Sequence, residues 1–254
     1  MISKSDRHSN TDASNTRFPH LVTGGGRRLG LAIIQHLVAQ GELVVTSYRT
    51  HSHEVEELNS LGVHCIQADF TSKRQLDDLI TQIQSEYTGL RSIIHNASDW
   101  ASESEESDLY ALMERMWQVH VAAPYQINMS LKNLLCHAAE SLGEATDIIH
   151  LTDFVAEKGS DKHIAYASSK AGLANLSLSF SRQLAPKVKV NAIAPSLLMF
   201  QEGDNKEYQQ KALKKSLLCL EPGEQEGVAA VQYLLNSRYM TGRTLALDGG
   251  RHLA

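Results

Sequence analysis

Short apolar runs alternate with longer amphipathic stretches along the chain from Phe18 onward. An apolar run of a few residues is typical of a buried strand, whereas apolar positions that recur every three or four residues indicate a helix with one buried face. Strands that alternate with helices form βαβ units, in which the strands lie parallel in one sheet. The pattern therefore predicts an α/β fold with a single Rossmann-type, doubly wound parallel sheet of about seven strands and helices on both faces.

The expected elements follow one another with short connections. Strands are predicted at His20–Thr23, Leu43–Tyr48, His64–Ala68, Ser92–His95, Asp147–Leu151, Lys189–Ile193 and Thr244–Leu247. Helices are predicted at Leu29–Gln40, His53–Leu61, Lys73–Tyr87, Glu105–His137, Ile164–Ala185, Asn205–Cys219 and Glu224–Asn236. The polar centre of Leu197–Lys211 suggests a mobile flap. A chain of 254 residues has the size of one such domain, which we expect over residues 18–254.

Composition and charge narrow the classes of partner. The chain is 42% hydrophobic and 21% charged, and its formal net charge is -5. A protein that binds phosphate backbones needs a basic excess, so nucleic acid is not an expected partner. Cys65, Cys136 and Cys219 lie far apart and lack metal-ligand or redox spacing, which indicates reduced, mostly buried thiols and no metal site.

The beginning of the chain has a different character. Residues 1–16 are almost wholly polar and lack the apolar segment of a secretion signal. No later segment approaches the length of a membrane span. We therefore expect a disordered polar tail over residues 1–17, a cytoplasmic protein and no membrane partner.

A glycine-rich turn, Thr23-Gly24-Gly25-Gly26-Arg27-Arg28-Leu29-Gly30, follows the first strand and opens the first helix. Glycine permits a tight turn, and the amides at the start of a helix can meet a pyrophosphate. A helix-entry loop without a ligand has the same composition, so the turn alone is weakly diagnostic. Its place between a strand and a helix favours a dinucleotide, which we expect Gly24, Arg27, Arg28 and Leu29 to contact.

The second strand ends in Ser47-Tyr48-Arg49-Thr50, and this segment indicates which dinucleotide binds. A cofactor without a 2′-phosphate favours an acidic residue here, whereas the guanidinium of Arg49 suits a phosphate. With Tyr48 beside it and Arg27 as a second cation, Arg49 favours NADPH, although it also suits a solvated surface position. Asp69 and Asn96-Ala97-Ser98 follow the next two strands and either border the cofactor or serve as turn residues.

Tyr166 and Lys170 are four residues apart at the start of a predicted helix, so their side chains share one face. A nearby ammonium stabilises a phenolate, and we therefore expect Lys170 to lower the pKa of Tyr166 toward neutrality. This spacing is common by chance on helices. Together with the glycine-rich turn it becomes specific.

Nearly the whole chain after Arg17 resembles the short-chain dehydrogenase/reductase family, through the glycine-rich turn, the Tyr166 and Lys170 pair, and Asp248-Gly249-Gly250. Three positions depart from the general family pattern. Arg28 replaces a second glycine, Asp153 stands thirteen positions before Tyr166 where serine is usual, and His95-Asn96-Ala97-Ser98 replaces Asn-Asn-Ala-Gly. At these points the chain is similar to the pteridine reductases of the family, which have Arg-Leu-Gly, Asn-Ala-Ser and an aspartate partnered with the tyrosine.

The resemblance implies an NADPH-dependent oxidoreductase that reduces the C=N bond of a dihydropterin. A hydride passes from the nicotinamide to the ring carbon, and a proton reaches the adjacent nitrogen. Tyr166 would donate the proton, Lys170 would tune it and hold the nicotinamide ribose, and Asp153 would face the pterin. Trp100 would stack on the pterin. The other implied contacts are Arg28 with a phosphate or the pterin carbonyl, and Pro195 and Ser196 with the nicotinamide amide.

Several alternatives stay open. Asp153 is also placed to cap a loop, and Trp100 also suits an exposed or packed indole. His120 stands where the family has an asparagine that organises a proton-relay water, and it suits either that water or the core. The family's long paired helices, here Glu105–His137 and Ile164–Ala185, imply a homotetramer. Competing functions are a short-chain reductase of a sugar, acyl or steroid carbonyl and a non-catalytic NADPH sensor.

Overall fold

The computed structural model describes residues 17–254, so the predicted tail lies outside the described residues except for Arg17. Seven strands form one parallel sheet in the order β3-β2-β1-β4-β5-β6-β7, which confirms the predicted fold class. Their bounds are β1 His20–Thr23, β2 Val44–Tyr48, β3 His64–Gln67, β4 Ser92–His95, β5 Thr146–Leu151, β6 Val188–Pro195 and β7 Thr244–Leu247. The strand order reverses between β1 and β4, and such a switch point opens a crevice at the carboxyl ends of the strands.

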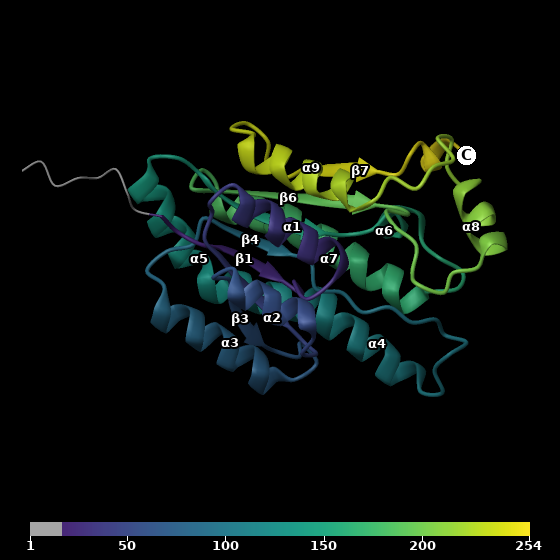
Figure 1. The fold of residues 1–254 in the computed structure, drawn as a ribbon, viewed down its shortest axis with the longest axis horizontal. Coiled ribbons are helices and arrows are strands. Elements are labelled where there is room, and N and C mark those ends of the chain that lie inside the picture. Colours follow the sequence, from purple (N-terminus) through teal and green to yellow (C-terminus); the bar gives the residue numbers. More distant parts are fainter. Residues whose placement is uncertain (1–16) are drawn as a thin grey trace, which may run out of the picture.

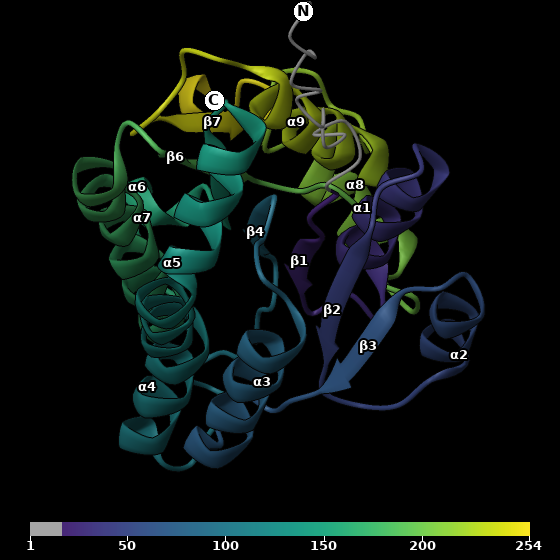
Figure 2. The ribbon, with the colours of Figure 1, turned by 90° about the vertical axis from the view of Figure 1, so that its left-hand side faces the viewer.

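Helices cover both faces of this sheet (Figure 1). Their bounds are α1 Arg28–Ala39, α2 His53–Ser60, α3 Lys73–Glu86, α4 Leu109–Trp117, η1 Gln118–Ala122, α5 Ala123–Leu142, α6 Val155–Lys158, α7 Ile164–Leu184, α8 Lys206–Leu213, α9 Glu224–Asn236 and η2 Arg251–Leu253. Figure 2 shows α5 and α7 on one side of the strands and α1 and α2 on the other. Leu131 and Phe180 belong to the apolar core on the first side, and Ile34 and Val231 to the core on the second.

The predicted helix Glu105–His137 consists of three pieces with different bounds. Asp108 caps α4 by accepting hydrogen bonds from two backbone amides at 3.0 Å, so the helix begins after it. The π-helical turn η1 follows because Pro124 has no amide hydrogen to donate to the carbonyl of His120. Gly143, in a left-handed conformation, ends α5 beyond the predicted boundary.

The stretch after β6 also differs from the prediction. Asn205 caps α8 by accepting from the amide of Tyr208 at 2.8 Å, so the second half of Leu197–Lys211 is helical and not a flap of loop. The helix predicted at Asn205–Cys219 ends at Leu213, and turns follow. The short helix α6, directly after β5, was not predicted because four residues are too few to show a period.

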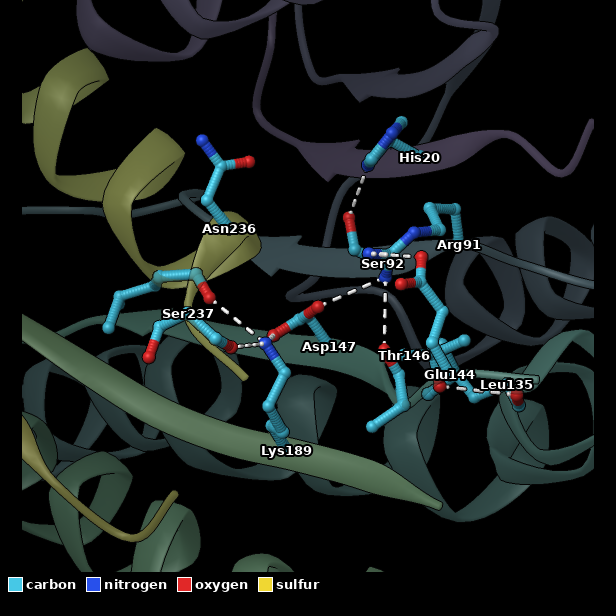
Figure 3. A network of polar contacts seen from close by, with 12 residues as sticks. His20, Arg91, Ser92, Leu135, Glu144, Thr146, Asp147, Lys189, Asn236 and Ser237 are labelled. Atoms are coloured by element: carbon cyan, nitrogen blue, oxygen red, sulfur yellow. Dashed lines mark hydrogen bonds and ion pairs between the residues drawn. The ribbon is translucent and has the colours of Figure 1, made fainter. Parts of the chain in front are cut away.

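A buried charge network closes the sheet at the amino ends of its central strands (Figure 3). Asp147, whose side chain is 1% exposed, lies 3.0 Å from Nη1 of Arg91 and 2.7 Å from Nζ of Lys189. Burial raises the pKa of Asp147 to about 6, although both cations oppose the shift. Nearby, His20 Nδ1 lies 2.7 Å from Ser92 Oγ. This network is at the opposite edge of the sheet from the crevice, so it supports the fold.

Within residues 17–254, the longest helices are too polar to cross a membrane, and the more apolar ones too short. The same residues contain no group of three or more His, Cys, Asp or Glu side chains that is arranged to hold a metal ion. All three cysteines are free thiols. Cys65 and Cys136 are half-buried, whereas Cys219 is exposed, contrary to the expectation of mostly buried thiols.

Candidate active site

An open cleft of about 770 Å³ lies at the carboxyl ends of β1, β2 and β4. Most residues that the sequence indicated for the cofactor line this cleft together with the indole expected at the substrate. They are Gly24, Arg27, Arg28, Leu29, Tyr48, Arg49, Asp69, Asn96, Ala97, Ser98 and Trp100. Four segments that are distant in the sequence therefore meet at the switch point of the sheet, where a dinucleotide binds in this fold class.

The glycine-rich turn is fixed by close approach to the segment after β4. A Cβ atom on Gly24, whose φ is +69°, would lie 2.8 Å from the Cα of Ala97, so a side chain does not fit there. Asn96 donates its amide hydrogens to the carbonyls of Thr23 at 3.1 Å and Gly24 at 2.9 Å. The Asn96 side chain thus holds the turn in place and shapes the cleft.

Arg28 occupies a backbone conformation that explains the glycine usual at this position. Its φ is +52°, in the left-handed region that glycine adopts without steric cost. The Arg28 guanidinium donates to the carbonyl of Met199 at 3.2 Å, and so connects the turn to the segment before α8. Leu29 packs toward α9, where a Cβ on Gly227 would lie 2.6 Å from it. Leu29 therefore offers the cleft mainly its backbone.

The glycine-rich turn and the end of β2 each present an arginine to the cleft. Arg27 is exposed, and the side chain of Arg49 is 51% exposed and lies 3.5 Å from Oδ2 of Asp99. Asp99 is also 3.5 Å from Nε of Arg115, so a second cation shares its charge. The glycine cradle, the cleft and two accessible arginines fit a dinucleotide that carries an additional phosphate. Asp69 lines the cleft while its Oδ1 accepts two 2.9 Å bonds within its own turn.

Tyr166, Asp153 and Lys170 come together beside the cleft, at the carboxyl end of β5. The Tyr166 hydroxyl donates to Oδ2 of Asp153 at 2.8 Å, and Lys170 Nζ donates to the Leu151 carbonyl at 2.8 Å. Oδ1 of Asp153 accepts from the amide of Val155 at 2.9 Å. Asp153 therefore caps the loop, as one of the two interpretations has it, and also pairs with the tyrosine, as the resemblance implies.

Burial controls the protonation of this group and corrects one expectation from the sequence. Burial and then the charge of Asp153 raise the pKa of Tyr166 well above its ordinary value, so the prediction of a lowered pKa is wrong. Burial also raises the pKa of Asp153. It lowers the pKa of Lys170 to about 8, against the opposing attraction of Asp153. The Tyr166 hydroxyl thus keeps its proton, and both carboxyl oxygens of Asp153 accept hydrogen bonds.

His120 is fully buried in η1, and both of its ring nitrogens have protein partners. Ser169 donates its hydroxyl hydrogen to the Tyr166 carbonyl, so Nδ1 of His120 donates to Ser169 Oγ at 2.8 Å. Nε2 accepts from the amide of Asp99 at 3.2 Å and lies 2.9 Å from Ser98 Oγ. Burial and then the charge of Lys170 lower its pKa, consistent with this neutral form. His120 ties the cleft segment to α7, and neither nitrogen is left for a relay water.

A second chain of buried histidines lies under the same end of the sheet. His95 Nε2 contacts Asn128 Oδ1 at 2.7 Å, and Asn128 Nδ2 contacts His150 Nε2 at 3.1 Å. His150 Nδ1 is 2.8 Å from Ser177 Oγ. The His95 and His150 rings stack with centroids 4.9 Å apart. This chain joins β4 and β5 to the helices that carry the site.

Trp100 is 52% exposed, and its ring centroid lies 4.5 Å from that of His163. His163 Nδ1 contacts the carbonyl of Ala101 at 3.2 Å, which fixes the imidazole beside the indole. His163 was missed in the sequence because no pattern links it to Trp100.

Pro195 ends β6, and Ser196 follows it. The amide of Phe154 donates to the carbonyl of Pro195 at 2.9 Å. Pro195 and Ser196 thus adjoin the Asp153 segment, but the cleft lining does not include them.

Known proteins match this chain over almost its whole length. A family model described as enoyl-(acyl carrier protein) reductase matches residues 26–252. Dihydromonapterin reductase of Citrobacter koseri is 51% identical over 239 residues, which are 94% of this chain and 98% of that protein. Dihydromonapterin reductase of an Escherichia coli strain is 50% identical over 235 residues, which are 92% of this chain and 97% of that protein.

Solved structures show the same fold. FolM alternative dihydrofolate reductase 1 of Brucella canis, complexed with NADP, has a TM-score of 0.82 at 28% identity and covers 93% of this chain and 94% of its own. An apo SCOR enzyme from Clostridium thermocellum has a TM-score of 0.83 at 20% identity, with 94% of each chain covered. The second likeness shows the fold alone.

Proposed function

The chain belongs to the short-chain dehydrogenase/reductase family, and we propose that it reduces a 7,8-dihydropterin to its tetrahydro form with NADPH. The relatives named dihydromonapterin reductase support dihydromonapterin as substrate, and the neighbour named dihydrofolate reductase supports dihydrofolate. Dihydrobiopterin is a third substrate of the same class. The observation that carries the proposal is the hydrogen bond from Tyr166 to Asp153, beside a cleft walled by Trp100.

The cofactor is NADPH, which supplies a hydride when bound. The amides of the glycine-rich turn would hold its pyrophosphate, and Arg27 and Arg49 would hold its 2′-phosphate. Lys170 would hold the nicotinamide ribose. Pro195 and Ser196 are placed beside the Asp153 segment, which suits the nicotinamide end.

The proton comes from the chain's own buried pair. Tyr166 gives its hydroxyl proton to the ring nitrogen of the substrate, and Asp153 passes its proton to the Tyr166 oxygen across their 2.8 Å contact. Burial, which raises the pKa of Asp153, favours uptake of the proton that replaces the one Tyr166 gives up, and the ammonium of Lys170 offsets the carboxylate that remains after the transfer. Trp100 supplies a flat face for the pterin, and Ser98 and Arg28 border the same space.

Two groups of exposed apolar side chains support a homotetramer. One group lies on α7 and on α4 and α5, each of which packs against α7, and comprises Leu109, Tyr110, Met113, Trp117, Tyr125 and Leu178. The other lies near the end of the chain and comprises Leu217, Leu218, Leu220 and Leu253. Two separate patches suit two different interfaces, as in a dimer of dimers. We place this assembly in the cytoplasm, in one-carbon metabolism, where reduced pterins and folates serve.

The proposal is tested by following NADPH oxidation with dihydromonapterin, dihydrobiopterin and dihydrofolate under matched conditions. We expect turnover of at least one dihydropterin and loss of that activity in Asp153→Ser, with the NADPH dissociation constant little changed. NADPH oxidation with sugar, acyl or steroid carbonyls, and none with dihydropterins, would replace the proposal by the competing one. NADPH binding without any turnover would favour a sensor.

A further inference from the structure

A second hollow, of about 420 Å³, lies apart from the cleft, where α6, α8 and η2 meet. Figure 1 shows α6, α8 and the end of the chain at the end of the molecule toward which the arrows of β6 and β7 point. We call this second hollow the basic pocket. It is lined by Phe154, Lys158, Lys214, Lys215, Arg251 and Ala254, so four of its six lining side chains carry positive charge, and the main-chain carboxylate of Ala254 is the one anionic group among these residues.

The protein neutralises these cations only in part. Burial comes first among the causes that lower the pKa of Lys215, followed by the charges of Arg251, Lys162 and Lys211, while Asp161 opposes them. Within the described part of the chain, none of these cations, nor Lys158 or Lys214, forms an ion pair. The chain as a whole has a net charge of -5, so this concentration of cations is local. A bound anion would relieve their repulsion.

The basic pocket adjoins the reacting end of the active site. The Arg251 guanidinium lies 4.8 Å over the ring of Phe154, the residue directly after Asp153. The charge of Arg251 is also among those that act on the carboxyl of Asp153. By contrast, Arg27 and Arg49 line the other cleft and serve its opposite, adenosine end. An anion in the basic pocket would therefore belong to the substrate side.

We propose that the basic pocket binds the carboxylates at the end of the side chain of a reduced pterin such as dihydrofolate. The proposal rests on the proposed function and deepens it, because it predicts a preference among dihydropterins. Dihydrobiopterin and dihydromonapterin have uncharged side chains and would leave the pocket unused. Lysine and arginine side chains bind carboxylates and free phosphate in the same way, so the experiments below distinguish these two ligands.

The first experiment compares the charge-reversal variant Lys158→Glu/Lys214→Glu with a control, Arg182→Glu/Arg238→Glu, whose exposed cations lie elsewhere and change the net charge equally. At saturating NADPH and low salt, we expect kcat/KM for dihydrofolate to fall about tenfold, because two exposed cations that attract its carboxylates are replaced by anions that repel them. For dihydrobiopterin we expect less than about a twofold change, and the control should affect neither substrate. Equal losses on both substrates, or no loss on either, would overturn the proposal.

The second experiment measures binding without turnover, so that it decides the pocket even if no dihydropterin is reduced. Folate and biopterin are titrated calorimetrically into the complex with NADP. We expect folate to bind more tightly, with an advantage that shrinks as salt rises and disappears in the double variant. Inorganic phosphate should weaken folate binding and leave biopterin binding unchanged. If phosphate binds but folate has no advantage over biopterin, the pocket holds a free anion and the proposal fails.

Discussion

The hydroxyl of Tyr166 and the carboxyl of Asp153 share a 2.8 Å hydrogen bond at a place where burial raises the pKa of both groups. Burial therefore opposes loss of the Tyr166 proton and makes Asp153 easier to protonate than an exposed aspartate. Such a pair suits a reaction that needs a proton delivered, as reduction of an imine does. Serine at position 153 would offer a hydroxyl but no ionisable reserve.

Replacing Tyr166 by Phe should lower kcat by about a hundredfold or more, because general-acid catalysis contributes on that scale. The wild type should lose kcat/KM as pH rises through the raised pKa of Asp153, since its protonated form is the active one. In Asp153→Asn this limb should vanish together with most of the activity. Stopped-flow measurement of NADPH oxidation across pH tests both. A Tyr166→Phe variant of normal turnover would exclude Tyr166 as the donor.

Arg49→Asp should raise the KM for NADPH far more than the KM for NADH. The change removes the guanidinium that we propose binds the 2′-phosphate and puts a repelling carboxylate beside Asp99, which lies 3.5 Å from Arg49 in the parent. Arg74→Asp, a change at an exposed arginine on α3, serves as the control. Steady-state kinetics with both cofactors give the ratio. Equal effects on the two cofactors would show that Arg49 does not bind the 2′-phosphate.

Trp100→Ala should weaken binding of a non-reacting pterin to the NADP complex about tenfold, because stacking and apolar area are lost together. Trp100→Phe should keep most of the affinity. The chain has two tryptophans, so a Trp117→Phe background leaves Trp100 as the sole indole, whose emission the pterin should quench. Quenching absent in that background, with binding intact, would place the pterin elsewhere.

Acid should destabilise the protein from about pH 6.5 downward, because burial lowers the pKa values of His20, His95, His120 and His150. The unfolded chain then binds more protons than the folded one. Burial lowers the pKa of His95 to about 4, so this group alone would account for roughly 3 kcal/mol of lost stability. Asp147, with a pKa raised to about 6, opposes the loss below that pH.

Urea unfolding at pH values on both sides of about 6.5 measures this dependence. His95→Asn should reduce the pH dependence of the unfolding free energy, whereas His53→Gln, at an exposed position, should leave it unchanged. An unfolding free energy that stays constant or rises on acidification would contradict the assignment.

The sheet was predictable because a buried strand and an amphipathic helix differ in period, and each predicted strand lies where a strand is found. The cleft was predictable because the glycine-rich turn, Arg49 and Asn96 each follow a strand whose carboxyl end meets the others. The interruption at η1 was not predicted because hydrophobic periodicity does not change at Pro124, although the missing amide hydrogen was a local signal for it.

The pKa shifts in the site depend on contacts between side chains, which the spacing of residues along the sequence does not reveal. The spacing of Tyr166 and Lys170 was correct, but the direction of the pKa shift of Tyr166 was set by burial and by Asp153. Likewise, no sequence pattern indicated that Arg251 returns to Phe154 or that Trp100 rests against His163. These contacts arise from the packing of segments that lie far apart along the chain.

Arg28 is a position where selection for stability and selection for catalysis would choose different residues. A left-handed arginine costs roughly 1–2 kcal/mol, which glycine would recover on folding. Glycine would also remove the only link from the turn's side chains to the Met199 carbonyl that the described contacts show. A library screened for heat resistance should therefore accumulate glycine at position 28. A library screened for growth that depends on the enzyme making its product should restore arginine.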